Sequence, residues 1–310
     1  MRIWRLCIDM PRLNVYLSDQ VYELANRWKE HSNLSEICAR AIKDELGAIE
    51  GHRTADKFFQ LIRSPNDAEK ALKVKYGLTD VVISEVNADS FEIREALGKA
   101  AAAYLDQNIS DGSVIALAGG RQMWCAVRNL SPRRVKTKIT ALGMHQTDPS
   151  LLHAHPNTLA TLIWLLYSPR SEAHVVGSSD KNNPWSDDLP VKPYPTYFVV
   201  SSCSSFEEKT SFSQLMGHDA AKALIRKNAL GDYAYVFFNK KGTEIDLSLS
   251  APHFRLSALQ LKKLSARTDA RTILVAGGSE KFEAIRTTLA MRLSNTLITD
   301  GRTAKKLLDP

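Results

Sequence analysis

The hydrophobic pattern changes once along the chain and separates a short N-terminal segment from a longer C-terminal one. In residues 12–17 polar and apolar positions alternate, which is typical of a β-strand with one buried face. Ser18 can cap a helix over residues 21–28, where apolar positions recur every three or four residues. A second helix is expected over residues 33–46, with Glu36 in the capping-box position.

A strand and two helices within about 35 residues bury too little surface to fold alone, and an unpaired strand needs a partner. Two copies that pair their strands antiparallel would solve both problems. The stretch resembles the ribbon-helix-helix family of DNA-binding domains, whose two-stranded ribbon enters the major groove. By this resemblance, the residues expected on DNA are Arg12, Asn14 and Tyr16 at the bases, and Asn33, Leu34 and Ser35 at phosphates.

The same pattern also fits a plain β-hairpin edge and two helices within a larger fold. Residues 1–50 contain seven Lys and Arg but eight Asp and Glu. Attraction to phosphate therefore depends on local placement and not on bulk charge. The first twelve residues hold Arg2, Arg5 and Arg12 against a single acid, Asp9, and form the most basic arm of this segment.

From residue 78 onward, apolar runs of strand length alternate with helical patterns. This order predicts an α/β domain with a mainly parallel sheet and helices on both faces. Strands are expected at residues 81–83, 114–117, 138–141, 196–200, 233–238, 272–276 and 295–298. Helices are expected at residues 67–76, 91–107, 121–130, 157–166, 213–227, 257–265, 280–289 and 302–308. Residues 168–195 and 201–210 are expected to form long loops, which often lie over a site.

Two of these strands end in a glycine pair that leads into a helix. The residues concerned are Gly119, Gly120, Arg121 and Gln122 after the first strand, and Gly277, Gly278 and Lys281 after the second. Glycine lets the backbone approach a ligand closely, and the amides at a helix N-terminus attract anions. A bare glycine pair is more often only a tight turn, and neither pair matches a P-loop or a dinucleotide fingerprint.

Separated segments of the C-terminal part resemble the effector-binding domain of the SorC family of bacterial sugar-responsive transcriptional regulators. The matching segments are residues 75–83, 97–105, 111–115, 119–120, 157–160, 231–232, 237–242, 276–281, 284–285 and 297–300. The resemblance implies a Rossmann-like fold related to sugar-phosphate isomerases, which binds a phosphorylated sugar that alters DNA binding. It also implies effector contacts from Gly119, Gly120, Arg121 and Gln122 at one end, from Gly277, Gly278 and Lys281 at a phosphate, and from Asn157 and Asp232.

The chain departs from the family pattern at three places. Arg121 and Gln122 stand where small hydroxyl residues are common, and Arg121 could bind a phosphate or carboxylate or fill the pocket. Asn239 stands where Asp is usual. The family normally begins with a helix-turn-helix domain, whereas this chain resembles ribbon-helix-helix. We therefore divide it into a DNA-binding domain (1–50), a linker helix (51–70) and an effector-binding domain (71–310).

Charge and residue composition limit the possible partners, the compartment and the metal content of the protein. The net charge of +7 and a pI near 9.1 permit an anionic partner. The four cysteines form no C-x-x-C pair, and neither a signal peptide nor a membrane-spanning apolar run is found, which predicts a cytoplasmic protein with reduced thiols. His145, His153 and His155 lie close in sequence, but nothing completes a ligand set, so no metal or cofactor is expected.

Together these observations predict a sequence-specific regulator whose affinity for a double-stranded DNA operator changes with a small phosphorylated or otherwise anionic metabolite. The ribbon requires at least a dimer, and the SorC resemblance suggests a tetramer. Two alternatives stay open. One is a sugar-phosphate isomerase-like enzyme, for which Asp232 is the suggestive general base. The other is an oligomeric assembly protein that does not bind DNA.

Overall fold

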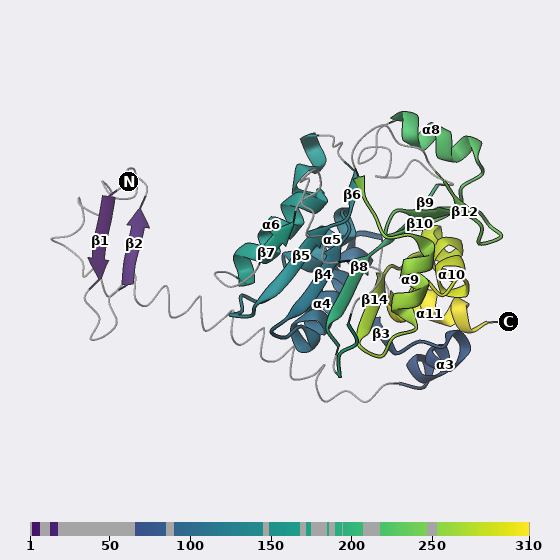
Figure 1. The fold of residues 1–310 in the computed structure, drawn as a ribbon, viewed down its shortest axis with the longest axis horizontal. Helices are drawn as coiled ribbons and strands as arrows, with labels where there is room; N and C mark the ends of the chain where they lie inside the picture. Colours follow the sequence, from purple (N-terminus) through teal and green to yellow (C-terminus); the bar gives the residue numbers. More distant parts are fainter. Residues whose placement is uncertain are drawn as a thin grey trace. The chain divides into compact units, whose positions relative to one another are not determined.

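The computed structural model describes residues 2–6, 13–17, 66–84, 90–144, 149–167, 172–174, 185, 190–193, 195–206, 218–246 and 253–309. The chain divides into two compact units, Met1–Arg63 and Ser64–Pro310 (Figure 1). This boundary lies inside the segment 51–70 that we expected to be a linker.

In the first unit, β1 (Arg2–Leu6) pairs antiparallel with β2 (Leu13–Leu17). The register aligns Arg5 with Asn14 and Ile3 with Tyr16. The expected strand at 13–17 is confirmed. The premise that it has no partner within the chain is wrong, because β1 supplies one.

Most of the predicted DNA-binding segment lies outside the described residues. This holds for Arg12, for Asn33, Leu34 and Ser35, and for both helices expected over residues 21–46. The ribbon-helix-helix arrangement therefore stays a prediction.

The second unit is built on a seven-stranded sheet whose strand pairs are parallel, in the order β3-β15-β14-β8-β4-β5-β7. Its strands are β3 (Asp80–Ser84), β4 (Ser113–Leu117), β5 (Thr137–Ala141), β7 (Glu172–His174), β8 (Tyr197–Ser201), β14 (Ala270–Val275) and β15 (Thr296–Asp300). The expectation of a mainly parallel sheet is confirmed. β7 lies within residues 168–195, so the expectation that this whole stretch is a loop is wrong.

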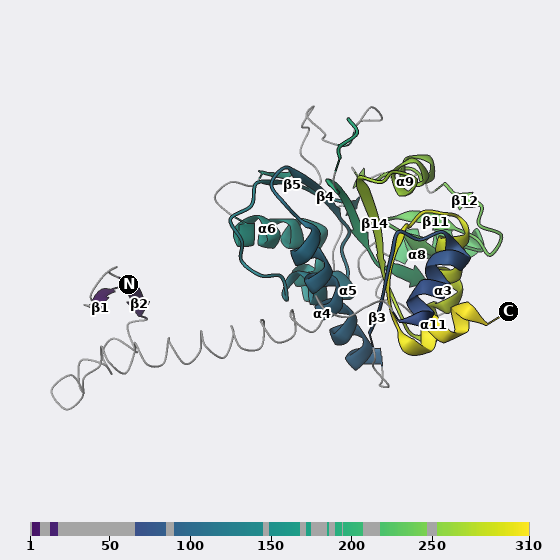
Figure 2. The same ribbon diagram turned by 90° about the horizontal axis from the view of Figure 1, so that it is seen from below.

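Helices cover both faces of this sheet, as Figure 2 shows. One face carries α4 (Ser90–Asn108), α5 (Arg121–Val127) and α6 (Pro156–Tyr167), with the 3-10 helix η1 (Pro149–Ala154) before α6. The other carries α3 (Asp67–Tyr76), α8 (His218–Arg226), α9 (Ala258–Ser265), α10 (Phe282–Ala290) and α11 (Gly301–Leu308), with the 3-10 helix η2 (Ser279–Lys281) before α10. Ile115 and Leu117 of β4 enter the core beneath α4, whereas Ala116 enters the opposite core, as strand alternation requires.

Local sequence explains where several helices begin and end. Asn66 and Glu69 form a reciprocal capping box that begins α3, and Gly77 ends it in the left-handed conformation. Ser257 and Gln260 form the same box at α9. The expected helix 67–76 is confirmed with both its ends, because both ends carry these local signals.

A small antiparallel sheet beside the main one was not expected. It has the order β12-β11-β10-β9, formed by β9 (Cys203–Ser205), β10 (Gly231–Tyr233), β11 (Val236–Phe238) and β12 (Glu244–Ile245). A further pair joins β6 (Gly143–Met144) to β13 (His253–Phe254). The expected single strand over 233–238 is wrong, because the chain reverses at Ala234-Tyr235. The expected loop over 201–210 is wrong at β9.

None of the helices in the described ranges is long and apolar enough to cross a lipid bilayer.

Candidate functional site

The strand order places the two glycine pairs on either side of β8, at the carboxyl ends of central strands of the main sheet. After β4 the chain continues to β5 on one side, whereas after β8 it continues toward β14 on the other side. In open α/β sheets, ligands bind at the carboxyl ends of strands where the order reverses in this way. Gly119 follows β4 and Gly277 follows β14, and both strands flank β8.

The first glycine turn is packed closely against other parts of the chain. The Gly119 amide donates to the Tyr235 hydroxyl at 3.2 Å, and the Gly120 amide donates to the Ala154 carbonyl at 2.8 Å. A Cβ on Gly119 would lie only 2.7 Å from Cδ of Pro156, the first residue of α6. Glycine is required here because another segment approaches so closely. Asn157, partly buried, is the second residue of α6 and therefore lies beside this turn.

The side chains of the two residues after this turn have different surroundings. Arg121, the first residue of α5, is exposed. Gln122 is buried, and its Nε2 donates to the Arg94 carbonyl of α4 at 3.1 Å. Gln122 therefore fastens α5 to α4.

The second glycine turn already binds a carboxylate of the chain itself. The Gly278 amide donates to Oδ2 of Asp300 at 2.9 Å, and Asp300 is buried. A Cβ on Gly277 would overlap the same carboxylate. Asp300 also accepts from the Thr303 amide at 3.0 Å and so caps α11. A phosphate at this turn would have to share or replace that amide bond and would otherwise rely on Lys281.

Asp232 is a buried carboxylate with two amide partners. Its Oδ1 accepts from the Ser204 amide at 3.1 Å, and its Oδ2 accepts from the Tyr235 amide at 3.2 Å. Burial raises the pKa of Asp232 to about 6, against the opposing effects of bonds from Ser204 and the positive charge of Lys281. The 3-10 helix η2, which carries Lys281, packs against β9, and β9 pairs with β10, the strand that carries Asp232.

Tyr235 contacts the first glycine turn, and nothing in the sequence predicts that it lies there. Ala234 and Tyr235 form the β10–β11 turn with φ values of 51° and 63°, in the left-handed region that costs residues with side chains about 1–2 kcal/mol each. A Cβ on Gly143 would lie 2.7 Å from Cζ of the Tyr235 ring. Burial raises the pKa of Tyr235, so its hydroxyl stays a neutral hydrogen-bonding group.

Neighbouring polar groups hold this strained turn in place. The Asp232 carboxylate accepts from the Tyr235 amide, and the Ser201 hydroxyl accepts from the Ala234 amide at 3.1 Å. The tyrosine hydroxyl is thus fixed at the end of β4, and Asp232 acts through it as a positioning residue. No Gly, Asn or Pro marks the turn in the sequence, so no local signal could have revealed it.

The carboxyl end of the sheet combines two glycine turns, the buried Tyr235 hydroxyl, Lys281, and two buried carboxylates, Asp232 and Asp300, that accept protein amides. Such a site suits a polar ligand with an anionic group. Within the described ranges no cluster of His, Cys, Asp and Glu could hold a metal ion. The fold and this end of the sheet define a Rossmann-like ligand-binding domain.

Comparison with known proteins identifies the family. The model of the "Putative sugar-binding domain" family matches residues 61–163 and 199–309, and the chain belongs to this family. The deoxyribonucleoside regulator of Bacillus subtilis (strain 168) is 26% identical over 253 residues, which cover 77% of this chain and 78% of that protein. The sorbitol operon regulator of Klebsiella pneumoniae is 23% identical over 259 residues, covering 77% and 79%.

A solved structure shows the same fold. The full-length sorbitol operon regulator SorC from Klebsiella pneumoniae superimposes with a TM-score of 0.62 at 20% identity, covering 95% of this chain and 100% of that one. The expected resemblance to the SorC effector-binding domain is therefore confirmed.

Proposed function

We propose that this chain is a transcriptional regulator that binds an operator and senses a small sugar-like metabolite at the switch-point edge of its main sheet. The observation that carries the proposal is the match of the sugar-binding domain model across the α/β unit. The relatives named above are regulators, which agrees with a regulator rather than an enzyme.

The effector is a phosphorylated or otherwise anionic sugar. Its anionic group binds beside Gly278 and Lys281, and the opposite end of the ligand lies near Gly119, Gly120 and Arg121. The packing of η2 against β9 supports this placement, because it brings Lys281 to the same end of the sheet as the Tyr235 turn. Gly277, Gln122 and Asn157 are further proposed effector residues, and Asp232 supports the site by holding the Tyr235 turn in place.

DNA is bound by the N-terminal ribbon. A two-stranded β-ribbon fits the major groove, and the antiparallel pairing of β1 with β2 provides a ribbon within one chain. Arg12, Asn14 and Tyr16 read bases in this proposal, with the amides of Asn33, Leu34 and Ser35 at phosphates. A dimer formed through this first unit would present two such ribbons, and further contacts would make a tetramer. Such a protein acts in the cytoplasm.

Effector binding changes DNA affinity only if the ligand prefers one arrangement of the oligomer over another. Binding of purified protein to candidate operator DNA, with and without sugar phosphates, tests this linkage. Lys281→Ala should abolish the effect of the sugar phosphate and leave DNA binding intact. The Lys222→Ala variant, which removes an exposed cation of α8, serves as the matched control.

The ribbon assignment has its own test. Replacing Arg12 and Asn14 by Ala should abolish operator binding and leave the oligomer intact in sedimentation. Lys99→Ala, which removes an exposed cation from α4, is the control and should bind DNA normally. Retention of full DNA affinity by the ribbon variant would show that these residues do not read the operator.

The surroundings of Asp232 do not suit the general base that the enzyme alternative requires. Both carboxylate oxygens of Asp232 accept protein amides, and the residue is only 6% exposed. A general base must reach the proton that it removes. A turnover assay on pentose and hexose phosphates should therefore show no reaction above the uncatalysed rate.

A further inference from the structure

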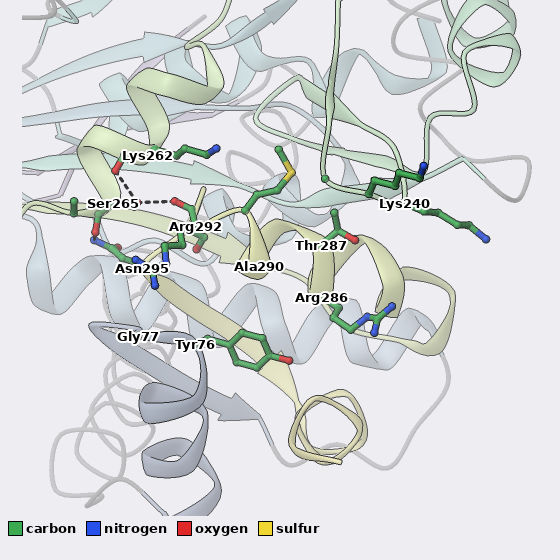
Figure 3. Close-up of a pocket in the computed structure, with 15 residues that line it drawn as sticks. Tyr76, Gly77, Lys240, Lys262, Ser265, Arg286, Thr287, Ala290, Arg292 and Asn295 are labelled. Carbon is green, nitrogen blue, oxygen red and sulfur yellow. Dashed lines mark hydrogen bonds between the residues drawn. The ribbon is translucent and has the colours of Figure 1, made fainter. Parts of the chain in front are cut away.

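A polar pocket lies at the end of the main sheet opposite the glycine turns. It has a volume of about 840 Å³ and is shown in Figure 3. Asn295, directly before β15, and Ala266, shortly before β14, belong to its wall, as does Gly77 at the end of α3. The pocket therefore faces the amino ends of the strands, whereas the proposed effector site faces their carboxyl ends.

The wall of this pocket is cationic. It contains five cations and neither Asp nor Glu; the cations are Lys240, Lys241, Lys262, Arg286 and Arg292. Figure 3 shows Lys240, Lys262 and Arg286 extending from three separate parts of the chain around the pocket. Segments distant in sequence thus contribute charge to one place, which a single solvated helix face would not do.

The negative carboxyl ends of nearby helices offset only part of the positive charge of the pocket wall. The helices α3, α9 and α10 all end at the pocket, and each carboxyl end carries about half a negative charge, roughly −1.5 in total. Arg286 also pairs with Glu283 at 2.6 Å, but that pair is exposed and therefore weak. Lys241, Lys262 and Arg292 alone carry +3 against roughly −1.5 from the three helix ends, so the pocket wall is positive.

The backbone at the pocket is fixed in an unusual conformation. Arg292 follows α10 with φ +56°, at a position where helices usually place glycine. The Ser265 hydroxyl donates to the Arg292 carbonyl at 2.7 Å, and Nδ2 of Asn295 donates to the Ser265 carbonyl at 3.0 Å. Arg292 therefore occupies a strained position in a wall that hydrogen bonds hold in place.

We propose that this pocket is a second anion-binding site, which takes a compact ligand with two or more neighbouring phosphate groups. Its volume is within the range of small-molecule sites. Cations from three parts of the chain suit several phosphates better than one. The polyphosphate tail of a nucleotide and a sugar bisphosphate share this chemistry. The inference does not depend on the effector assignment.

Calorimetric titration of the full chain with sodium tripolyphosphate tests the site. The chain carries Lys281→Ala, so that the proposed effector site does not contribute. We expect saturable binding of one ion per chain. The double variant Lys262→Ala/Arg286→Ala should weaken it at least about tenfold, because each lost charge removes a charge-assisted bond. Lys263→Ala is the matched control, since Lys263 is exposed in the same turn of α9 but does not line the pocket.

Competition then identifies the source of the phosphates. Displacement by adenosine triphosphate alone indicates a nucleotide, and displacement by glucose 1,6-bisphosphate alone indicates a sugar ligand. If the first double variant fails to fold, Lys240→Ala/Lys241→Ala replaces it, with the same expected loss.

Four results would overturn the site. The first is the absence of saturable tripolyphosphate binding, and the second is an equal loss of affinity in the Lys263→Ala variant. The third is that the unmodified chain binds tripolyphosphate and the Lys281→Ala chain does not. The fourth is that Lys262→Ala weakens the binding of random duplex DNA while tripolyphosphate does not bind.

Discussion

Replacing Asp232 by Asn separates two effects that the structure assigns to its carboxylate. Asn keeps one oxygen acceptor, so one of the two amides of Ser204 and Tyr235 loses its partner. A buried amide without an acceptor costs about 1–3 kcal/mol. Protonated Asp232 also keeps only one good acceptor oxygen, so this cost is small at low pH, and at higher pH it is already contained in the pKa. The substitution also removes a carboxylate that is unfavourable in its ionised form.

The ionisation of Asp232 gives the second effect a definite pH window. Burial raises its pKa from 3.8 to about 6, so the folded protein binds this proton more tightly than the unfolded chain does. The stabilisation of the folded protein by this proton is fully present below about pH 4 and is lost as the pH rises through 6. A shift of about two pKa units corresponds to about 3 kcal/mol. The free energy of unfolding of Asp232→Asn, relative to the natural protein, should therefore rise by about 3 kcal/mol from pH 4 to pH 7.

Urea unfolding followed by circular dichroism at several pH values measures this difference. At pH 4 the variant should differ from the natural protein by less than about 1 kcal/mol, because folded Asp232 is protonated there, and by pH 7 it should be more stable by about 3 kcal/mol. Asp246→Asn, which replaces an exposed carboxylate, is the control and should stay within about 0.5 kcal/mol throughout. A difference between Asp232→Asn and the natural protein that does not vary with pH would refute the burial argument.

Three further predictions concern the turns and the effector lysine. Gly277→Ala should lower the free energy of unfolding by about 3 kcal/mol, because its Cβ would overlap the Asp300 carboxylate. Gly301 has open space around it, so Gly301→Ala should change the free energy of unfolding by less than about 0.5 kcal/mol in the same urea titrations. Arg292→Gly should raise it by about 1 kcal/mol by removing the left-handed strain, and unchanged stability would show that no strain is stored there. Lys281→Ala should weaken sugar phosphate binding in calorimetry by at least about tenfold, whereas an unchanged affinity would place the phosphate elsewhere.

Much of the α/β unit could be predicted from sequence because local signals agree with the tertiary structure. The helix 67–76 carries a capping box at one end and glycine at the other, and the structure keeps both. Gly119 and Gly277 come to the same edge because parallel strands separated by helices must align their carboxyl ends.

The failures occur where packing overrides local preference. The buried run 233–238 reads as one strand, yet Asp232 and Ser201 hold a turn at Ala234-Tyr235 that carries no turn residue. The cationic pocket was also beyond sequence reasoning, because its charges come from segments as far apart as residues 240 and 292. The partner strand at residues 2–6 was missed because those residues were interpreted as a basic arm.

Binding of the purified protein to DNA from upstream of its own gene tests metabolite-controlled DNA recognition most directly. The titration is made at several salt concentrations, with and without sugar phosphates. We predict a strong preference over random DNA, a steep salt dependence, and a change in affinity of about fivefold or more on adding the correct sugar phosphate. Weak binding without preference, unaffected by any sugar phosphate, would contradict a metabolite-controlled regulator.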